Sequence, residues 1–218
     1  MRVFGPGTGQ YAVPDGVVAL DVVAQGGGGG GAGAHVPNVS VLAGAGGGGA
    51  GGHVKARITG SALQQSYTYT VGAGGAGGLS LPAAGETRSG EDGGDTQFGS
   101  GVAAVFASGG MGAPERIANG GYRHYLPGEG GSASGGDLAI AGQPGSSGTT
   151  YGSLNVITGS QAGGSTLLGG GGVPRPGNGL DATGYGAGGA GAGMTPKVVL
   201  AASGGAGSDG VLLLTEYY

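Results

Sequence analysis

Residues 22–35 read VVAQGGGGGGAGAH, and this stretch decides the fold. An apolar, strand-like run ends at six consecutive glycines, and the same change from ordinary residues to glycine recurs along the chain. Glycine has no side chain to bury, and it loses more conformational freedom on ordering than any other residue. If a chain with 63 glycines among 218 residues folds, we expect those glycines to be packing residues themselves.

The composition sets disorder against a folded chain. Glycine and proline, with 63 and 10 residues, reach the fraction that is typical of low-complexity disorder. Disordered chains are usually rich in charge, whereas this chain has eight Lys and Arg, twelve Asp and Glu, and a mean hydropathy of +0.09. Because an unfolded chain of this kind is expected to aggregate, the balance favours a fold.

The same numbers argue against several classes of function. The basic residues are few and scattered and the net charge is −4, which does not favour nucleic-acid binding. Cysteine is absent, so disulfides and thiol chemistry are excluded. No run approaches the ~18 apolar residues of a membrane span, and we expect a chain that is not inserted in a membrane.

Ordinary strand signals lie near both ends of the chain. Strands are predicted at 11–13, 17–25, 53–58, 67–71 and 211–218, with a Pro-Asp-Gly turn at 14–16. The segments 53–58 and 67–71 alternate in the manner of a half-buried hairpin. No segment of a dozen residues keeps helical spacing without glycine, so we predict essentially no long helix.

Ten glycine-rich tracts lie between the other segments, at 26–31, 44–52, 72–78, 90–94, 109–112, 128–136, 142–148, 169–172, 184–193 and 204–210. So many flexible linkers of similar length are not needed to join anything. A helix of the polyproline II type has three residues per turn and no internal hydrogen bonds, so its N–H and C=O groups point outward. Only glycine lets such helices approach closely enough to bond one another. We therefore predict packed polyglycine II helices with an interior made of main chain.

The three-residue turn makes a further prediction about the side chains within the tracts. Those that are tolerated should recur at spacing three on an outward edge. Ala73 and Ala76 have this spacing, as do Ala187 and Ala190, whereas the alanine pair of the second tract does not.

Tracts of six to nine residues, roughly 19–28 Å long at ~3.1 Å per residue, are expected to run out and back. An even number of tracts returns the chain to its starting end, where the terminal strands can pair. We predict one all-β domain, 1–218, of about ten packed polyglycine II helices on a small strand base. The base comprises 1–25, 53–71, 95–108, 137–141, 173–183 and 211–218. The far end comprises five loops, 32–43, 79–89, 113–127, 149–168 and 194–203.

Few residues are arranged for catalysis or metal binding. Matches to dinucleotide-binding patterns arise by chance in so much glycine, and the three histidines are isolated. We therefore expect no enzymatic activity, no cofactor and no metal. Glu91, Asp92 and Asp95 allow two interpretations: a cation site of oxygen ligands or, more favoured, a solvated polar turn.

The far-end loops carry the side chains that suit recognition. Loop 113–127, APERIANGGYRHYLP, gathers two tyrosines, an arginine and a histidine, and Tyr and Arg are frequent interface hot spots. An equally supported alternative is that Tyr122 and Tyr125 cover the bundle edge while Arg123 is solvated. The predicted receptor-binding residues are His35, Pro37, Asn38, Leu79, Leu81, Arg116, Ile117, Tyr122, Arg123, His124, Tyr125, Leu126, Tyr151, Leu154, Asn155, Met194 and Lys197.

Three stretches of the chain resemble the glycine-rich adhesins at the distal tips of bacteriophage tail fibres, including those of T-even-like phages. They are FGPGTGQYAVPDGVVALDVVAQGGGGGG at 4–31, GGHVKARITGSALQQSYTYTVGAGGAGG at 51–78 and GGAGSDGVLLLTEYY at 204–218. The resemblance implies a polyglycine II sandwich on the virion, at the distal tail or tail fibre. Its far-end loops would bind an outer-membrane protein or surface glycan of the host bacterium.

The resemblance also bears on how the protein is attached. Such adhesins often carry an N-terminal attachment domain, whereas this chain opens almost directly with a strand. Docking to other tail or fibre proteins is therefore expected through the strand base, unless the chain is a fragment or belongs to another tail part.

These observations predict a non-enzymatic phage receptor-binding protein. The alternative, from another class, is an ice-binding or structural glycine-rich protein, since some ice-binding proteins are also bundles of such helices. That function requires a flat repetitive face and short uniform turns, and the long irregular loops argue against it.

Overall fold

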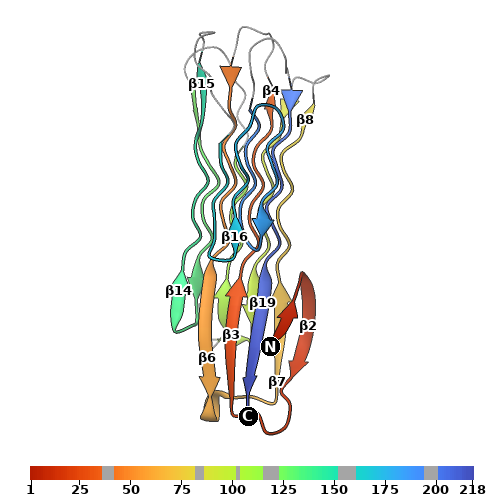
Figure 1. Ribbon diagram of the computed structural model, residues 1–218, viewed down its shortest axis with the longest axis vertical. Coiled ribbons are helices and arrows are strands. Elements are labelled where there is room, and N and C mark those ends of the chain that lie inside the picture. The colour runs from red at the N-terminus through yellow and green to blue at the C-terminus, as the bar shows by residue number, and fades with distance from the viewer. Residues whose placement is uncertain (36–41, 82–85, 102–103, 115–122, 152–160, 194–200) are drawn as a thin grey trace.

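The computed structural model describes residues 1–35, 42–81, 86–101, 104–114, 123–151, 161–193 and 201–218. The protein is all-β, as predicted, and its small sheets are antiparallel; the described residues contain one short 3-10 helix, η1 (Gly60–Ala62). Figure 1 shows an elongated molecule in which long strands and both termini lie at one end, the base. Glycine tracts run along the middle, and β4 (Ala34–His35), β8 (Ser80–Leu81) and β15 (Gly148–Tyr151) lie at the opposite, far end.

Five strands form the first base sheet, in the order β1-β19-β3-β6-β14. They are β1 (Arg2–Phe4), β19 (Val211–Tyr217), β3 (Ala19–Gln25), β6 (His53–Thr59) and β14 (Leu138–Ile140). The predicted pairing of the terminal strands is confirmed, because β19 lies between β1 and β3. The predicted turn at 14–16 is confirmed by a 3.3 Å hydrogen bond from the Val17 N–H to the Pro14 carbonyl. Gly16 has a φ of +85° in this turn, a conformation that favours glycine.

The second base sheet has the order β13-β11-β10-β7-β2. Its strands are β13 (Ala133–Ser134), β11 (Val105–Ala107), β10 (Thr96–Phe98), β7 (Ser66–Val71) and β2 (Gly7–Ala12). The predicted hairpin of 53–58 and 67–71 is therefore wrong, because β6 pairs with β3 and β7 pairs with β2 in separate sheets. Alternation of apolar and polar residues shows that a strand has one buried face, but it does not identify the strand alongside.

The side-chain core lies between the two base sheets. Val22 and Leu212 of the first sheet are completely buried, and Phe98 of the second is 1 % exposed. The rings of Tyr67 and Phe98 stack with 4.6 Å between their centroids. Each such buried side chain contributes about 1.5–3 kcal/mol relative to exposure. The few large apolar residues are therefore used where they hold the base together.

Beyond the base, the first glycine tract, 26–31, lies among other tracts to which it is joined by main-chain hydrogen bonds. Its N–H groups donate in turn to three neighbouring tracts, so that residues three apart share a neighbour. The donor and acceptor pairs, at 2.8–3.0 Å, are Gly26 to Gly52, Gly27 to Gly94, Gly28 to Ser208, Gly29 to Gly49, Gly30 to Glu91 and Gly31 to Gly205. The carbonyls of the same tract accept from three further tracts, through the amides of Gly110, Gly75 and Gly189. This tract is thus bonded to six neighbours.

The same tract shows why its residues are glycines. A Cβ placed at each position from 26 to 31 would overlap a backbone carbonyl of an adjacent tract. The carbonyls that it would meet, in order, are those of Ser108, Ala73, Ala187, Met111, Ala76 and Ala190. These atoms belong to hydrogen-bonded main chains, so they cannot move aside as the end of a flexible side chain would.

Side chains on the outward edges of the tracts follow the spacing of three only in part. Ala73 and Ala76 are exposed, as predicted. Ala187 and Ala190 are completely buried, so the prediction for this pair is wrong. Residues of the segment 169–183 lie beside this tract, since the Ala190 amide donates to the Leu180 carbonyl and the Gly172 amide donates to the Gly188 carbonyl.

Residues 173–183, which the sequence predicts in the base, instead run along the bundle. The Gly177 amide donates to the Gly193 carbonyl at 2.6 Å, and the Ala182 amide donates to the Ala206 carbonyl at 2.9 Å. β16 (Gly169–Gly170) pairs with β17 (Thr183–Gly184), and Figure 1 shows β16 part of the way along the bundle. This segment contains too little glycine to be recognised as a tract, yet a peripheral tract tolerates side chains on its outer face.

The remaining strands are short. They are β5 (Leu42–Ala43), β9 (Glu86–Thr87), β12 (Arg123–Tyr125) and β18 (Ala201–Ala202). Residues 161–164, which were expected in a far-end loop, also pack along the bundle, since the Gly164 amide donates to the Gly48 carbonyl at 2.9 Å.

A methyl group in the first tract tests the packing of main chain on main chain. Gly29→Ala places its Cβ against the Met111 carbonyl, whereas a Cβ at Gly5 meets nothing within 4 Å. We expect Gly29→Ala to lower the free energy of unfolding by about 3 kcal/mol, because overpacking and broken hydrogen bonds add. We expect Gly5→Ala to change it by less than about 0.5 kcal/mol. Urea denaturation followed by circular dichroism measures both, and equal stabilities would contradict the packing described.

Candidate functional site

Strand pairing brings the segments that flank the far-end loops together. β4 pairs with β18, which joins the loops 32–43 and 194–203. The three-stranded sheet β12-β15-β5 joins parts of the loops 113–127, 149–168 and 32–43. β8 and β9 pair with each other and lie against β4. Residues far apart in the sequence are therefore held at one end of the bundle, opposite the termini (Figure 1).

The predicted binding residues are placed unevenly by the structure. Leu79 and Leu126 are 54 % and 55 % exposed, which suits surface contact. Tyr125 is only 6 % exposed, which leaves little of its side chain for contact with a partner. His35, Leu81, Arg123, His124 and Tyr151 lie in the far-end strands. The others, Pro37, Asn38, Arg116, Ile117, Tyr122, Leu154, Asn155, Met194 and Lys197, lie outside the described residues.

Alanine side chains form a buried cluster beneath the far end, which the sequence analysis did not identify. Its members are Ala32, Ala34, Ala45, Ala113, Ala192 and Ala202. They lie where tracts pass into the flanks of the loops, so one small apolar cluster supports several loops at once. The signal that marks them in the sequence is the change from glycine to alanine at the end of a tract.

Two buried polar atoms at the far end have no hydrogen-bond partner within the described part of the chain. They are Nδ1 of His35 in β4 and Oγ of Ser80 in β8. β4 and β8 are in contact, so both atoms belong to the same corner of the far end. A buried polar atom without a partner costs about 1–3 kcal/mol, so these two atoms lower the stability of this corner.

The acidic residues at 91–95 lie in a tract rather than in a turn. Asp92 Oδ1 accepts a hydrogen bond from the Gly112 amide at 2.7 Å, and Asp95 Oδ1 accepts one from the Gly109 amide at 2.9 Å. The carboxylates lie three residues apart and so do the amides. The two aspartates thus bond to amides of the neighbouring tract. No group of three or more potential metal-ligating side chains occurs among the described residues.

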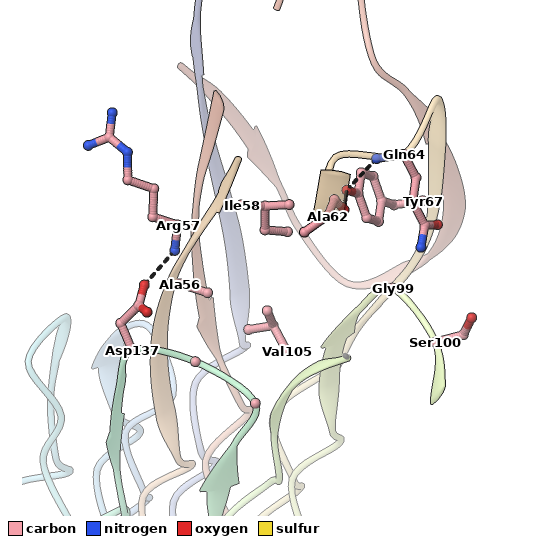
Figure 2. Close-up of a pocket in the computed structure, with 12 residues that line it drawn as sticks. Ala56, Arg57, Ile58, Ala62, Gln64, Tyr67, Gly99, Ser100, Val105 and Asp137 are labelled. Atoms are coloured by element: carbon pink, nitrogen blue, oxygen red, sulfur yellow. Dashed lines mark hydrogen bonds between the residues drawn. The ribbon is translucent and has the colours of Figure 1, made fainter. Parts of the chain in front are cut away.

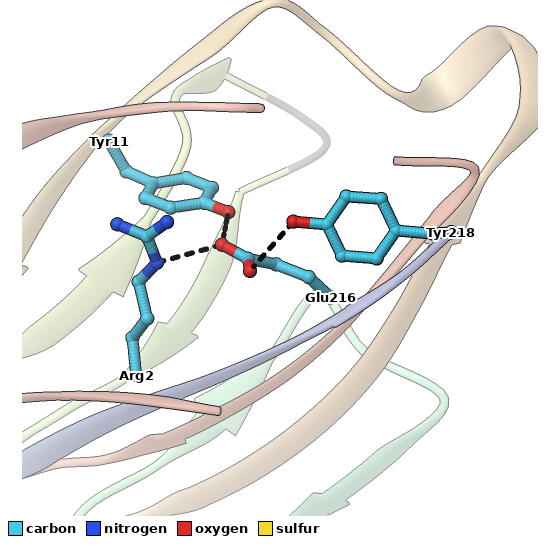
Figure 3. Close-up of polar contacts among 4 residues, drawn as sticks. All are labelled: Arg2, Tyr11, Glu216 and Tyr218. Carbon is cyan, nitrogen blue, oxygen red and sulfur yellow. Dashed lines mark hydrogen bonds and ion pairs between the residues drawn. The ribbon is translucent and has the colours of Figure 1, made fainter. Parts of the chain in front are cut away.

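A second cluster of titratable groups lies in the base and joins the two termini (Figure 3). Glu216 Oε1 accepts hydrogen bonds from the Tyr11 hydroxyl at 2.6 Å and from Arg2 Nε at 2.8 Å, and Glu216 Oε2 lies 3.4 Å from the Tyr218 hydroxyl. The hydrogen bond from Tyr11 lowers the pKa of Glu216; burial opposes this shift and the Arg2 charge adds to it. Burial, and then the bond to Glu216, raise the pKa of Tyr11. The Tyr11 hydroxyl therefore stays protonated and donates to Glu216. The cluster joins the strands that carry these residues.

The junction between base and tracts depends on a buried polar pair that the sequence analysis did not single out. Gln25 Nε2 donates to the carbonyls of Gly51 and Gly52, both at 2.9 Å, and Gln25 Oε1 lies 3.2 Å from His53 Nδ1. Burial lowers the pKa of His53, which favours a neutral ring. The position of Gln25, the last residue before the glycine run, is the signal that marks it in the sequence.

A family model described as a glycine-rich domain matches residues 4–217. No curated protein matches the chain. The part of the chain that the structure describes contains no helix long and apolar enough to cross a membrane.

The aspartates at the tract edge can be tested by removing one acceptor. Asp92→Ala leaves the Gly112 amide to water, and we expect it to lower the free energy of unfolding by about 1–2 kcal/mol. Asp92→Asn keeps an acceptor oxygen and should lose less than half as much. Urea denaturation of the three proteins measures the difference. If alanine and asparagine are equivalent, this hydrogen bond is not the stabilising contact.

The base cluster predicts a dependence of stability on pH. The pKa of Glu216 is lower in the folded than in the unfolded protein. Its contribution is therefore present above the unfolded pKa and is lost as the pH falls through the folded pKa. We expect the wild type to lose more stability than Glu216→Gln between about pH 6 and pH 3. Urea midpoints across this range provide the measurement, and parallel losses in the two proteins would refute the assignment.

Proposed function

The chain belongs to the glycine-rich domain family, and from this premise we propose that it is a phage tail receptor-binding protein. Its far end contacts an outer-membrane protein or surface glycan of a host bacterium, and its base attaches to other tail or fibre proteins of the virion. The observation that carries the proposal is the pairing of β4 with β18 and of β12 with β15 and β5. These pairs hold the flanks of several loops together at the end opposite the termini.

The tracts act as a stiff stalk in this proposal. The three-residue repeat of hydrogen bonds around 26–31 supports the interpretation that they are polyglycine II helices. A bundle cross-linked in this way holds its far end in place before a receptor arrives. The entropic cost of ordering the site is then borne during folding and not during binding, which favours affinity.

The chemistry of the far end supports binding rather than catalysis in this proposal, which includes no cofactor. Leu79 and Leu126 offer exposed apolar surface, and the partly buried His35 and Ser80 add polar residues to the same end. A mixture of this kind suits either a protein surface or a glycan.

An ice-binding function is the second candidate, because Ala73 and Ala76 form an exposed repeat at spacing three. Charged groups adjoin this repeat, since the Glu91 amide donates to the Ala76 carbonyl and Asp209 Oδ1 accepts from the Gly74 amide. A charged and irregular face of this kind is less suited to an ordered ice surface. Thermal hysteresis separates the two functions: clear activity without binding to cells would favour the ice-binding function.

Binding of labelled protein to a panel of bacteria tests the proposed receptor function. We expect at least one strain to bind the wild type, and protease or periodate treatment of the cells to identify a protein or glycan receptor. Replacing 115–122 with glycine and serine should reduce binding at least about tenfold, because binding energy is concentrated in a few residues. The replacement retains Ala113 and β12.

The matched control is Thr68→Ala, at an exposed position of β7 in the base. It should bind as the wild type does. If the loop replacement folds and binds normally, that loop is not part of the site; if no strain binds the wild type, the proposed function fails.

A further inference from the structure

A cavity of about 320 Å³ lies where the first base sheet passes into the glycine tracts. Its lining comes from the start of β6, from the end of β14 with the residues that follow it, and from the segment 165–167. Ile140 and Leu167 are exposed and form an apolar wall, whereas His53 is only 9 % exposed. No Asp, Glu, Lys or Arg occurs among the described residues that line it. A charged ligand would lose its hydration here without gaining a counter-charge, so the cavity favours a neutral ligand.

The two ring nitrogens of His53 differ in what they bond to. Gln25 Nε2 donates to the carbonyls of Gly51 and Gly52, so the amide oxygen of Gln25 faces the histidine and accepts from Nδ1 at 3.2 Å. The proton of the ring is therefore on Nδ1, and burial, which lowers the pKa of His53, keeps the ring neutral. Nε2 then carries a lone pair, and no described residue donates a hydrogen bond to it. A buried histidine thus presents an acceptor that the protein does not satisfy.

A donor group at the same cavity is held in a fixed orientation. Gln143 Oε1 accepts a hydrogen bond from the Ser165 amide at 3.2 Å, which leaves Gln143 Nε2 as a donor. Thr166 Oγ1 donates to the Tyr185 carbonyl at 2.7 Å, and this bond holds the segment that carries Ser165 against the bundle. The acceptor of His53 and the donor of Gln143 therefore line one preformed cavity.

A larger cavity, of about 360 Å³ and beside the base core, offers no comparable group (Figure 2). Tyr67 is the one buried residue with a polar side chain among the described residues that line it. Its hydroxyl donates to the Ala62 carbonyl at 3.0 Å and accepts from the Gln64 amide at 2.8 Å, as Figure 2 shows. The buried hydroxyl there is satisfied by the protein, whereas Nε2 of His53 is not. The comparison favours the cavity at His53 as the ligand site.

We propose that the cavity at His53 binds one unit of a neutral sugar. A sugar hydroxyl donates and accepts at once, so it donates to Nε2 of His53 and accepts from Nε2 of Gln143. The carbon-bound hydrogens of the sugar ring lie against Ile140 and Leu167. The volume falls within the ~300–1,000 Å³ of small-molecule sites, which combine an apolar lining with a few placed polar groups. The cavity lies at the base and not at the far end, so this site does not rest on the proposed function.

Titration with monosaccharides tests this proposal without cells, so its outcome is independent of bacterial adsorption. The probes are glucose, galactose, mannose and N-acetylglucosamine, each also as its methyl glycoside. Cyclohexanol, with a single hydroxyl, and glucuronate, with a charge, are the comparison ligands. We expect at least one sugar to shift the Nε2 signal of His53 in proton–nitrogen NMR spectra, with a Kd below about 10 mM. The two comparison ligands should bind at least about tenfold more weakly, because one lacks hydroxyls and the other must be desolvated.

Two variants and a control locate the site, with affinities taken from the amide signal of Ser165. His53→Asn keeps a side-chain N–H toward Gln25 but has no counterpart of Nε2, and it should weaken sugar binding at least about tenfold. Gln143→Glu keeps the oxygen that accepts from Ser165 but loses the donor, and it should weaken binding by a similar factor. The matched control, Gln65→Glu, makes the same change at an exposed position of the base and should bind as the wild type does.

Three results would overturn the proposal. They are the absence of binding by all four sugars, wild-type affinity in a folded His53→Asn or in Gln143→Glu, and cyclohexanol binding as tightly as the best sugar. If His53→Asn does not fold, Gln143→Glu alone decides. The methyl glycosides distinguish the source of the sugar: equal affinity for a sugar and its glycoside assigns the site to a unit of a glycan, and binding of the unmodified sugar alone assigns it to a free monosaccharide.

Discussion

Hydrogen bonding between the main chains of neighbouring tracts is the constraint on which the rest of the structure depends. A buried N–H or C=O group must have a partner, and a tract like 26–31 finds every partner on other tracts. The N–H and C=O groups of such a tract find no hydrogen-bond partners within the tract itself, so the bundle must form as a whole. Side chains are excluded wherever two main chains meet, as the overlap of a Cβ at Gly29 with the Met111 carbonyl illustrates.

The edges of the bundle and its two ends follow from this constraint. On the outside, where amides face outward, aspartates such as Asp92 and Asp95 supply acceptors. At the base, tracts become strands and ordinary side-chain burial takes over, with Gln25 bonded to the main chain at the transition. At the far end the tracts pass into short strand pairs above a cluster of alanines. The hydrogen-bonded tracts thus separate the end that contains the termini from the end that contains the short strand pairs (Figure 1).

Much of the fold could be predicted because glycine and apolar residues alternate in long blocks. The strands at both termini and the turn at 14–16 follow from local sequence, whereas the spacing of three was right for Ala73 and Ala76 and wrong for Ala187 and Ala190. The hairpin of 53–58 and 67–71 failed because alternation is the same whichever strand lies alongside. Residues 173–183 failed because their few glycines did not reveal a peripheral tract. Of the candidate site, the far-end placement of His35 and Leu126 could be predicted, but the burial of Tyr125 and the alanine cluster could not.

The sequence by itself determined that main chain must pack on main chain, since a chain with 63 glycines has too few side chains for a conventional interior. It also determined where strands replace tracts near the two ends of the chain, because that change is local and visible in the residues there. Only the tertiary structure decided which tracts are neighbours, which aspartate accepts a hydrogen bond from which amide, and which part of β6 stays unpaired. The physical reason is that glycines are chemically identical: they carry no side chain that distinguishes one neighbour from another, so their pairing is set by the packing of the whole bundle.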